Sequence, residues 1–232
     1  MPVNIEIYKD LIENVHNRMS FDNYSKKPLS RYYTFKQCFE HIQNIQNPIV
    51  LELGTSRSFV DGKYPVCYND DIKYWEPENP EKWDFGAGCF TKLCAEHNPH
   101  ATVYTVDMSA QHIRRSKIMT SNNENINYKI STSEQFLNNF HKKVDLLYLD
   151  TGDMWPIEPT AQLHLREAKI IIRRNILKDN GLILIDDVKN ATPFKYGETS
   201  LLGKAKYSIP YFMNNGYEMV ADEYQVILKK IK

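Results

Sequence analysis

The stretch Ile49-Val50-Leu51-Glu52-Leu53-Gly54 follows Pro48 and sets how the rest of the chain is interpreted. A short apolar run that ends at a glycine is typical of a buried strand that leads into a turn. Three more such runs follow, at residues 102–106, 144–149 and 181–185, and an aspartate follows each of them. We therefore expect all four runs to be strands of one sheet.

Helical patterns lie between these runs, near residues 87–97, 109–120, 133–141 and 160–178. Strands that alternate with helices predict a parallel sheet with helices on both faces, joined by right-handed crossovers. The runs at 219–221 and 226–228 are too close together for a parallel crossover, so we expect an antiparallel hairpin there. The predicted fold is α/β: Rossmann-like and doubly wound, with a mostly parallel sheet and an antiparallel C-terminal hairpin.

Two segments fall outside this alternation. Apolar residues at helical spacing predict N-terminal helices within residues 1–47, as an extension of a main domain at 48–232. Residues 59–85, directly after the first strand, combine aromatic and acidic side chains with prolines that exclude a continuous helix or central strand. We interpret 59–85 as a long ordered insertion that could act as a lid.

The composition argues against several classes of protein. The 232 residues carry 29 Lys plus Arg and 29 Asp plus Glu, so the formal net charge is zero. A neutral chain is a poor match for nucleic acid phosphates or anionic lipid, which require a basic face. No apolar run approaches the ~20 residues of a membrane helix, and the first residues lack the order of a signal peptide. The four cysteines show no Cys-x-x-Cys spacing, and we expect reduced thiols in a cytoplasmic protein.

Each predicted strand ends in an acidic residue or a glycine turn. Ligands of open α/β sheets bind at the carboxyl ends of the strands, so these residues are expected to border one crevice. They are Gly54, Asp107, Asp150, Asp186 and Asp187. Asp107 follows Gly54 by 53 residues, or by 26 when 59–85 are left out, and an acid at about that offset can accept both ribose hydroxyls of a nucleoside cofactor. The preference of aspartate for strand exits and helix caps is an alternative explanation.

These segments resemble the successive cofactor motifs of class I S-adenosylmethionine-dependent methyltransferases. The resemblance lies in Glu52-x-Gly54, in Asp107, and in Ser131-Thr132-Ser133-Glu134. It implies a seven-stranded sheet whose third strand comes directly before Ser131. It also implies that the glycine loop lies under the methionine part of the cofactor, that Asp107 holds the ribose, and that the loop after this third strand borders the adenine. The implied cofactor-binding residues are Glu52, Gly54, Thr55, Ser56, Ser58, Gly88, Asp107, Met108, Thr132 and Ser133. Either Gly86 or Gly88 could close the loop.

A narrower resemblance is to metal-dependent O-methyltransferases, of the catechol type and of the sugar type from macrolide and aminocoumarin biosynthesis. Leu149-Asp150-Thr151-Gly152-Asp153 and Leu184-Ile185-Asp186-Asp187-Val188 are similar to their metal-site segments. The resemblance implies Asp150, Asp186 and Asp187 as ligands of a divalent ion such as Mg²⁺, which prefers carboxylate oxygens, and Asp150 and Asp153 as catalytic residues. The catechol-type enzymes place a lysine in the first of these regions, and this sequence has none there.

Together the resemblances imply an S-adenosylmethionine-dependent methyltransferase (EC 2.1.1.-) that methylates an oxygen of a small hydroxylated molecule with the help of a divalent metal. The expected partner is this small-molecule acceptor, with no membrane or nucleic acid, and a homo-oligomer is left open. Two alternatives stay open. A nicotinamide-dependent oxidoreductase should carry G-x-G-x-x-G directly after the first strand, and residues 54–58 lack it. A non-catalytic binding subunit could also keep the cofactor fold.

Overall fold

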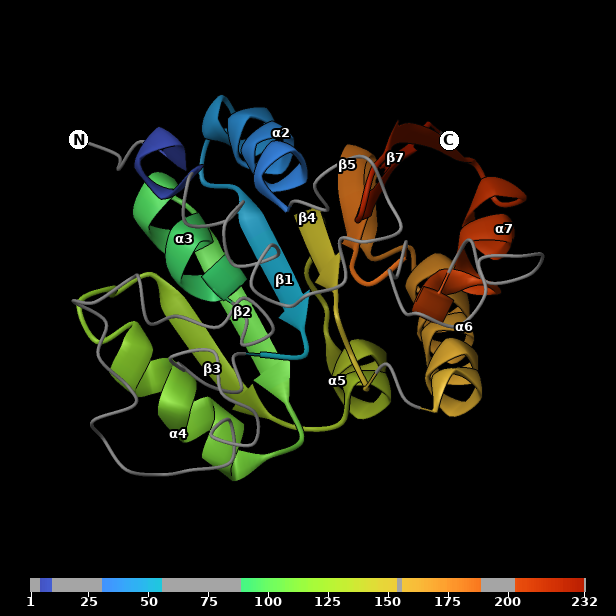
Figure 1. Cartoon of the computed structure of the whole chain (residues 1–232), viewed down its shortest axis with the longest axis horizontal. Coiled ribbons are helices and arrows are strands. Elements are labelled where there is room, and N and C mark those ends of the chain that lie inside the picture. Colours follow the sequence, from blue (N-terminus) through green and yellow to red (C-terminus); the bar gives the residue numbers. More distant parts are fainter. Residues whose placement is uncertain (1–4, 10–30, 56–88, 154–155, 189–202, 232) are drawn as a thin grey trace, which may run out of the picture.

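One sheet forms the centre of the structure, a computed structural model that describes residues 5–9, 31–55, 89–153, 156–188 and 203–231. Its seven strands lie in the order β3-β2-β1-β4-β5-β7-β6 (Figure 1). β7 is antiparallel to both of its neighbours, and every other pair is parallel. The strands are β1 (Ile49–Leu53), β2 (Thr102–Asp107), β3 (Ile126–Ile130), β4 (Val144–Leu149), β5 (Leu177–Ile185), β6 (Tyr217–Asp222) and β7 (Val226–Lys230).

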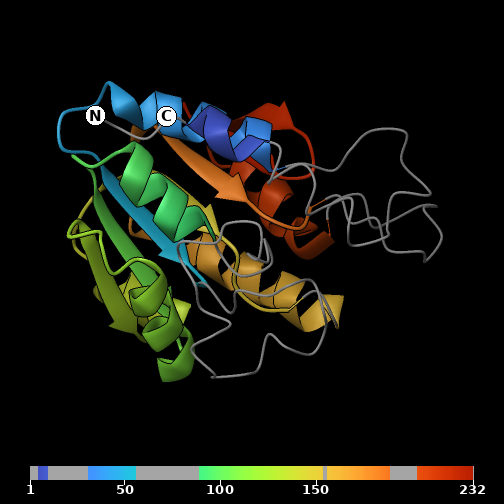
Figure 2. The ribbon, with the colours of Figure 1, turned by 60° about the vertical axis from the view of Figure 1, so that its left-hand side comes forward.

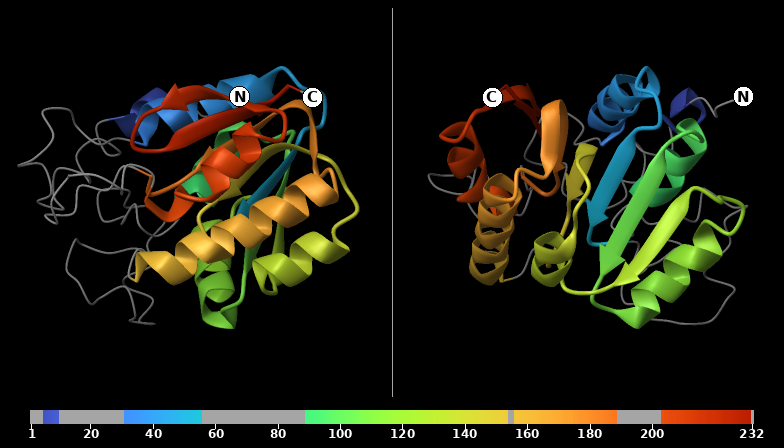
Figure 3. Two further views of the ribbon diagram at one scale, coloured as in Figure 1. Left: turned by 90° about the vertical axis from the view of Figure 1, so that its right-hand side faces the viewer. Right: turned by 180° about the vertical axis from the view of Figure 1, so that it is seen from behind.

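Helices cover both faces of the sheet. α2, α3 and α4 pack on one face, and α5, α6 and α7 pack on the other (Figure 3). The helices are η1 (Ile5–Tyr8), α2 (Tyr32–Gln43), α3 (Cys89–His97), α4 (Ala110–Met119), α5 (Ser133–Asn139), α6 (Ile157–Arg173), η6 (Gly203–Ala205) and α7 (Ser208–Met213), of which η1 and η6 are 3₁₀ helices. Within the described ranges, no helix has the length and apolar character needed to cross a membrane.

The central strands are apolar on both faces because each face is covered by helices. Val50 and Leu146 point into the core under α2 and α3, whereas their chain neighbours Leu51 and Leu147 point into the core under α5 and α6. In the first core the rings of Phe90 and Tyr148 stack with centroids 4.3 Å apart. The central strands are therefore packed on both faces up to the carboxyl ends that present the candidate site.

The structure confirms the predicted sheet type, the alternation with helices and the C-terminal hairpin. The largest difference in boundaries is at α6 and β5, because the helix expected over 160–178 ends at Arg173 and the strand expected over 181–185 already begins at Leu177. Asn175 takes a left-handed conformation with φ of 50°, and the N–H of Ile176 donates to the carbonyl oxygen of Ile171 at 3.0 Å. This pattern of one left-handed residue and a six-residue hydrogen bond is a helix stop, here built on asparagine in place of glycine.

The N-terminal segment contributes to the main core. α2 buries Phe35, Phe39 and Ile42 against the sheet, and η1 lies beside α2, where Lys36 pairs with Glu6 (Figure 2). Residues 1–4 and 10–30, which hold most of the first predicted helical stripe, lie outside the described residues, as does the insertion at 59–85.

Candidate cofactor and carboxylate site

The carboxyl ends of β1, β2 and β4 meet at Gly54. The N–H of Gly54 donates to the carbonyl oxygen of Val106 at 2.9 Å, and the N–H of Asp150 donates to that of Leu53 at 2.9 Å. Gly54 has φ of 89°, and a Cβ there would lie 2.8 Å from the carbonyl carbon of Asp150 and closer still to its oxygen. Only glycine fits this turn, which leaves backbone close to whatever occupies the crevice.

Asp107 is held beside this turn at the end of β2. Its carboxylate accepts the N–H of Thr55 at 3.2 Å and the N–H of Ser109 at 2.8 Å, and it lies 3.1 Å from Nδ1 of His112. Met108 follows with 74% of its surface exposed, the highest value among the exposed large apolar side chains of the described residues. An oriented acid beside an exposed apolar side chain is an arrangement that could hold a ribose and an attached ring.

Glu52 lies beneath the turn and is fully buried. Its Oε2 accepts hydrogen bonds from the hydroxyls of Thr91 and Thr105, while its Oε1 has no hydrogen-bond partner among the described residues. Burial raises the pKa of Glu52 to about 8, although the two threonine hydrogen bonds oppose that rise. The hydroxyl oxygens of Thr105 and Thr55 lie 2.6 Å apart, and because Thr105 gives its proton to Glu52, Thr55 is the donor in this pair; the buried acid is thus connected to the loop that carries Gly54.

The loop after β3 lies next to Asp107, since the N–H of Ser131 donates to the carbonyl oxygen of Asp107 at 3.0 Å. Thr132 caps α5, because its side-chain oxygen accepts the N–H of Gln135 at 3.2 Å. Threonine is a common residue at this position of a helix, so capping alone would account for its presence. Ser133 begins α5. The remaining predicted cofactor residues, Ser56, Ser58 and Gly88, lie outside the described residues.

Asp150, Asp186 and Asp187 come together at the ends of β4 and β5. Each can offer one oxygen so that all three oxygens lie within 4.8 Å of one another. We call these three residues the carboxylate cluster. Asp153, which the resemblance implies as a catalytic residue, is exposed and belongs to no such group of ligands among the described residues.

Two cations that the sequence analysis missed lie within this cluster. Nζ of Lys204 is 2.8 Å from Oδ1 of Asp150 and 2.8 Å from Oδ2 of Asp187. Nη2 of Arg31 is 2.8 Å from Oδ2 of Asp186 and 3.4 Å from Oδ1 of Asp187. Lys204 comes from η6 and Arg31 from the start of α2, both far in sequence from the strand ends.

Asp186 is satisfied almost entirely by protein donors. Besides Arg31, it accepts the hydroxyl of Tyr148 at 2.9 Å and the side-chain amide of Gln225 at 3.0 Å. Asp187 accepts the hydroxyl of Tyr224, whose ring also packs on the Arg31 guanidinium at 4.8 Å. Burial opposes ionisation of Asp187, but attraction to Lys204 and Arg31 outweighs it and holds the pKa of Asp187 well below its usual range.

The cluster can be tested for its fit to a divalent ion. Three carboxylates supply the hard oxygen donors that Mg²⁺ prefers. The ammonium of Lys204, however, lies between Asp150 and Asp187, where an ion that bridges them would have to bind, and the oxygens of Asp186 face N–H and O–H donors. In this arrangement the residues do not fit a divalent metal.

Two further ionisable groups lie behind the cluster on α6. Glu167 accepts the hydroxyl of Thr151 at 2.8 and 2.9 Å, and Nε2 of His164 lies 3.0 Å from the carbonyl oxygen of Thr151. Both are fully buried. Burial raises the pKa of Glu167 to about 7, whereas burial together with Lys204 lowers the pKa of His164 to about 3.

The strand order and the single antiparallel strand β7 define the fold of class I methyltransferases. Solved structures with this fold include the N-methyltransferase NodS from Bradyrhizobium japonicum, at 16% identity and a TM-score of 0.53 over 91% of this chain and 99% of that chain. The S-adenosylhomocysteine-bound methyltransferase PaMTH1 from Podospora anserina aligns with a TM-score of 0.54 at 12% identity, over 100% and 98% of the two chains.

A proposed caffeoyl-CoA O-methyltransferase from Staphylococcus aureus has a TM-score of 0.54 at 13% identity, over 98% of this chain and 97% of that chain. No protein-family profile and no curated protein matches the sequence. The shared feature is therefore the fold, and the chemistry must be argued from the site.

Proposed function

We propose that this chain is an S-adenosylmethionine-dependent methyltransferase that methylates an oxygen of a small hydroxylated molecule. The observation that carries the proposal is the turn at Gly54, which only glycine can form and which lies between the ends of β2 and β4. Close backbone approach on one side and the oriented carboxylate of Asp107 on the other suit a nucleoside cofactor at the switch point of an open sheet. Neighbours that are methyltransferases by name share this fold.

When bound, the cofactor supplies a methyl group made electrophilic by a sulfonium. The protein must then align the acceptor oxygen, the methyl carbon and the sulfur, and exclude water. Methylation of the acceptor oxygen would require a base of the protein to take the hydroxyl proton. We assign that role to Asp150 or Asp153, the carboxylates that follow β4, the strand next to the Gly54 turn.

Calorimetric titration with S-adenosylhomocysteine tests the cofactor part of this proposal. Asp107→Asn removes a charged acceptor and keeps the shape of the side chain. A hydrogen bond to a charged group contributes about 1.5–3 kcal/mol, so the Kd should rise roughly tenfold to hundredfold. Asp179→Asn is the matched control, because Asp179 pairs with Lys230 at the start of β5 and is exposed.

Absence of S-adenosylhomocysteine binding to the wild type would contradict the proposal, and binding of a nicotinamide cofactor instead would favour the oxidoreductase alternative. The acceptor part has a separate test. Asp150→Asn and Asp153→Asn should lower kcat with small hydroxylated acceptors and leave the Kd for S-adenosylhomocysteine within about twofold of wild type. If the cofactor binds and no acceptor is methylated, the non-catalytic alternative is favoured.

The metal-assisted form of this function stays a prediction from the sequence. The three predicted ligands do meet, but the cations among them favour a different arrangement of charge.

A further inference from the structure

We propose that the ammonium of Lys204 takes the place of a divalent metal ion in the carboxylate cluster of Asp150, Asp186 and Asp187, so that methyl transfer by this chain requires no divalent ion. The statement about methyl transfer rests on the proposed function. The statement about the cluster does not, because metal binding can be measured without any reaction.

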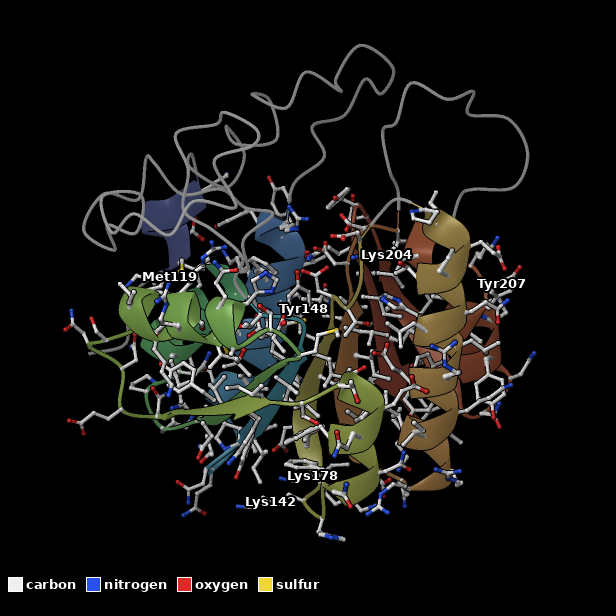
Figure 4. The ribbon with its side chains drawn as sticks, turned by 90° about the horizontal axis from the view of Figure 1, so that it is seen from below. Met119, Lys142, Tyr148, Lys178, Lys204 and Tyr207 are labelled. Carbon is white, nitrogen blue, oxygen red and sulfur yellow. The ribbon has the colours of Figure 1, made fainter. Side chains whose placement is uncertain are left out.

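The hydrogen bonds of Lys204 support this assignment. An ammonium has three protons to donate and no acceptor. Nζ of Lys204 has three acceptors in reach: Oδ1 of Asp150 and Oδ2 of Asp187, both at 2.8 Å, and the carbonyl oxygen of Gly152 at 3.3 Å. The side chain is completely buried. Lys204 is therefore a built-in cation that bridges the carboxyl ends of β4 and β5. Figure 4 shows it at the opposite end of the strands from Lys142 and Lys178.

The backbone around Lys204 fixes this position. Gly203 has φ of 43°, and a Cβ at that residue would lie 2.9 Å from the carbonyl oxygen of Val188 and closer still to that of Asp187. Asp187 itself has φ of 53°, which is uncommon for a residue other than glycine. η6 packs closely against the backbone of the carboxylate cluster. Lys204 therefore reaches its partners from a buried and fixed position.

The balance of charge leads to the same conclusion. Three carboxylates carry three negative charges, and Lys204 with Arg31 supplies two positive charges at hydrogen-bond distance. A divalent ion at the same oxygens would lie beside a buried ammonium and repel it. It could bind only if Lys204 left its three acceptors. Lys204 is thus a positioning residue that holds Asp150 in place.

The test is a titration of the full chain with Mn²⁺, followed by electron paramagnetic resonance and by the thermal unfolding midpoint. For the wild type we expect no bound Mn²⁺ into the millimolar range and the same Tm in Mn²⁺ as in EDTA, since a ligand that does not bind the native state cannot stabilise it. Lys204→Ala should gain a Mn²⁺ site and a Tm that rises with Mn²⁺. Lys142→Ala changes a lysine at the opposite end of the strands and should behave as the wild type.

Micromolar binding of Mn²⁺ to the wild type that Asp187→Asn abolishes would overturn the proposal. This comparison of the wild type with Asp187→Asn tests the proposal even if the Lys204→Ala variant does not fold. Failure of Lys204→Ala to bind Mn²⁺, although folded, would also overturn it. Titration of the same samples with S-adenosylhomocysteine distinguishes the two proposals. Absence of S-adenosylhomocysteine binding would contradict the proposed function, but it would not change the Mn²⁺ result for the carboxylate cluster.

Discussion

Replacement of Arg31 by methionine is the sharpest test of how the carboxylate cluster is stabilised. Arg31 is 4% exposed, and its guanidinium donates to Asp186 through Nε at 3.0 and 3.1 Å and through Nη2 at 2.8 Å. Arg31→Met keeps an unbranched apolar stem and removes only the charged fork. The carboxylate of Asp186 then stays buried with two neutral donors, Tyr148 and Gln225.

The expected cost follows from the burial of this pair. Removal of one partner of a buried ion pair leaves an uncompensated charge, which typically costs about 3–5 kcal/mol of unfolding free energy. In a protein of this length each kcal/mol shifts the Tm by roughly 2–4 °C, so we expect a Tm lower by roughly 6–20 °C. Urea unfolding followed by circular dichroism should show a lower midpoint with an unchanged m-value.

Arg166→Met provides the matched control. Nε of Arg166 lies 3.0 Å from Glu134, but the side chains are 51% and 36% exposed, and surface pairs of this kind contribute about 0–1 kcal/mol. Equal losses below about 1 kcal/mol for Arg31→Met and Arg166→Met would refute the reasoning. In addition, Arg31→Met combined with Asp186→Asn should lose less stability than the sum of the two single variants, because the double variant leaves no lone buried charge.

Three further predictions concern the same edge of the sheet and the core behind it. Gly54→Ala should lower both the Tm and the affinity for S-adenosylhomocysteine, because the left-handed turn alone costs alanine about 1–2 kcal/mol and the added methyl would also lie too close to the backbone of Asp150; an unchanged Tm and an unchanged Kd would contradict this. Protonated Glu167 stabilises the native state fully below pH 4.5, and this contribution of about 3 kcal/mol is lost as pH rises through about 7. Urea midpoints of Glu167→Gln should therefore fall less steeply than those of the wild type across that window, and parallel profiles would count against the burial argument. Burial raises the pKa of the thiols of Cys38 and Cys94, so mass spectrometry should find both unmodified after iodoacetamide treatment of the native protein and modified after unfolding.

The main strands could be predicted because helices cover both sides of them. The runs at 49–53 and 144–149 are apolar at nearly every position, and both became strands with the predicted limits. β3 (Ile126–Ile130) gives a weaker signal, since it lies at the edge of the sheet and its last residues are exposed. The end of α6 was missed because asparagine, not glycine, takes the left-handed position at Asn175.

The acidic half of the site could be predicted and its basic half could not. β1, β2, β4 and β5 are parallel, so the residues that follow them lie at the same end of the sheet. The meeting of Asp150, Asp186 and Asp187 therefore follows from the sequence pattern. Arg31 and Lys204 lie in segments outside the strands, so the strand order does not predict where they go. They are 155 residues from Asp186 and 54 residues from Asp150 in sequence, respectively. The glycine directly before Lys204 is a weak local signal, because glycine–lysine pairs are common in loops.

The position of these two cations in the chain also bears on biosynthesis. Arg31 leaves the ribosome well before Lys204, Tyr224 and Gln225. A nascent chain that ends after β5 holds three carboxylates and only one of their cations, and it also lacks β7, which pairs with β5. We therefore expect the carboxyl ends of β4 and β5 to stay open to solvent until β7 has left the ribosome, and protease protection of ribosome-bound chains should rise only once residue 230 has emerged.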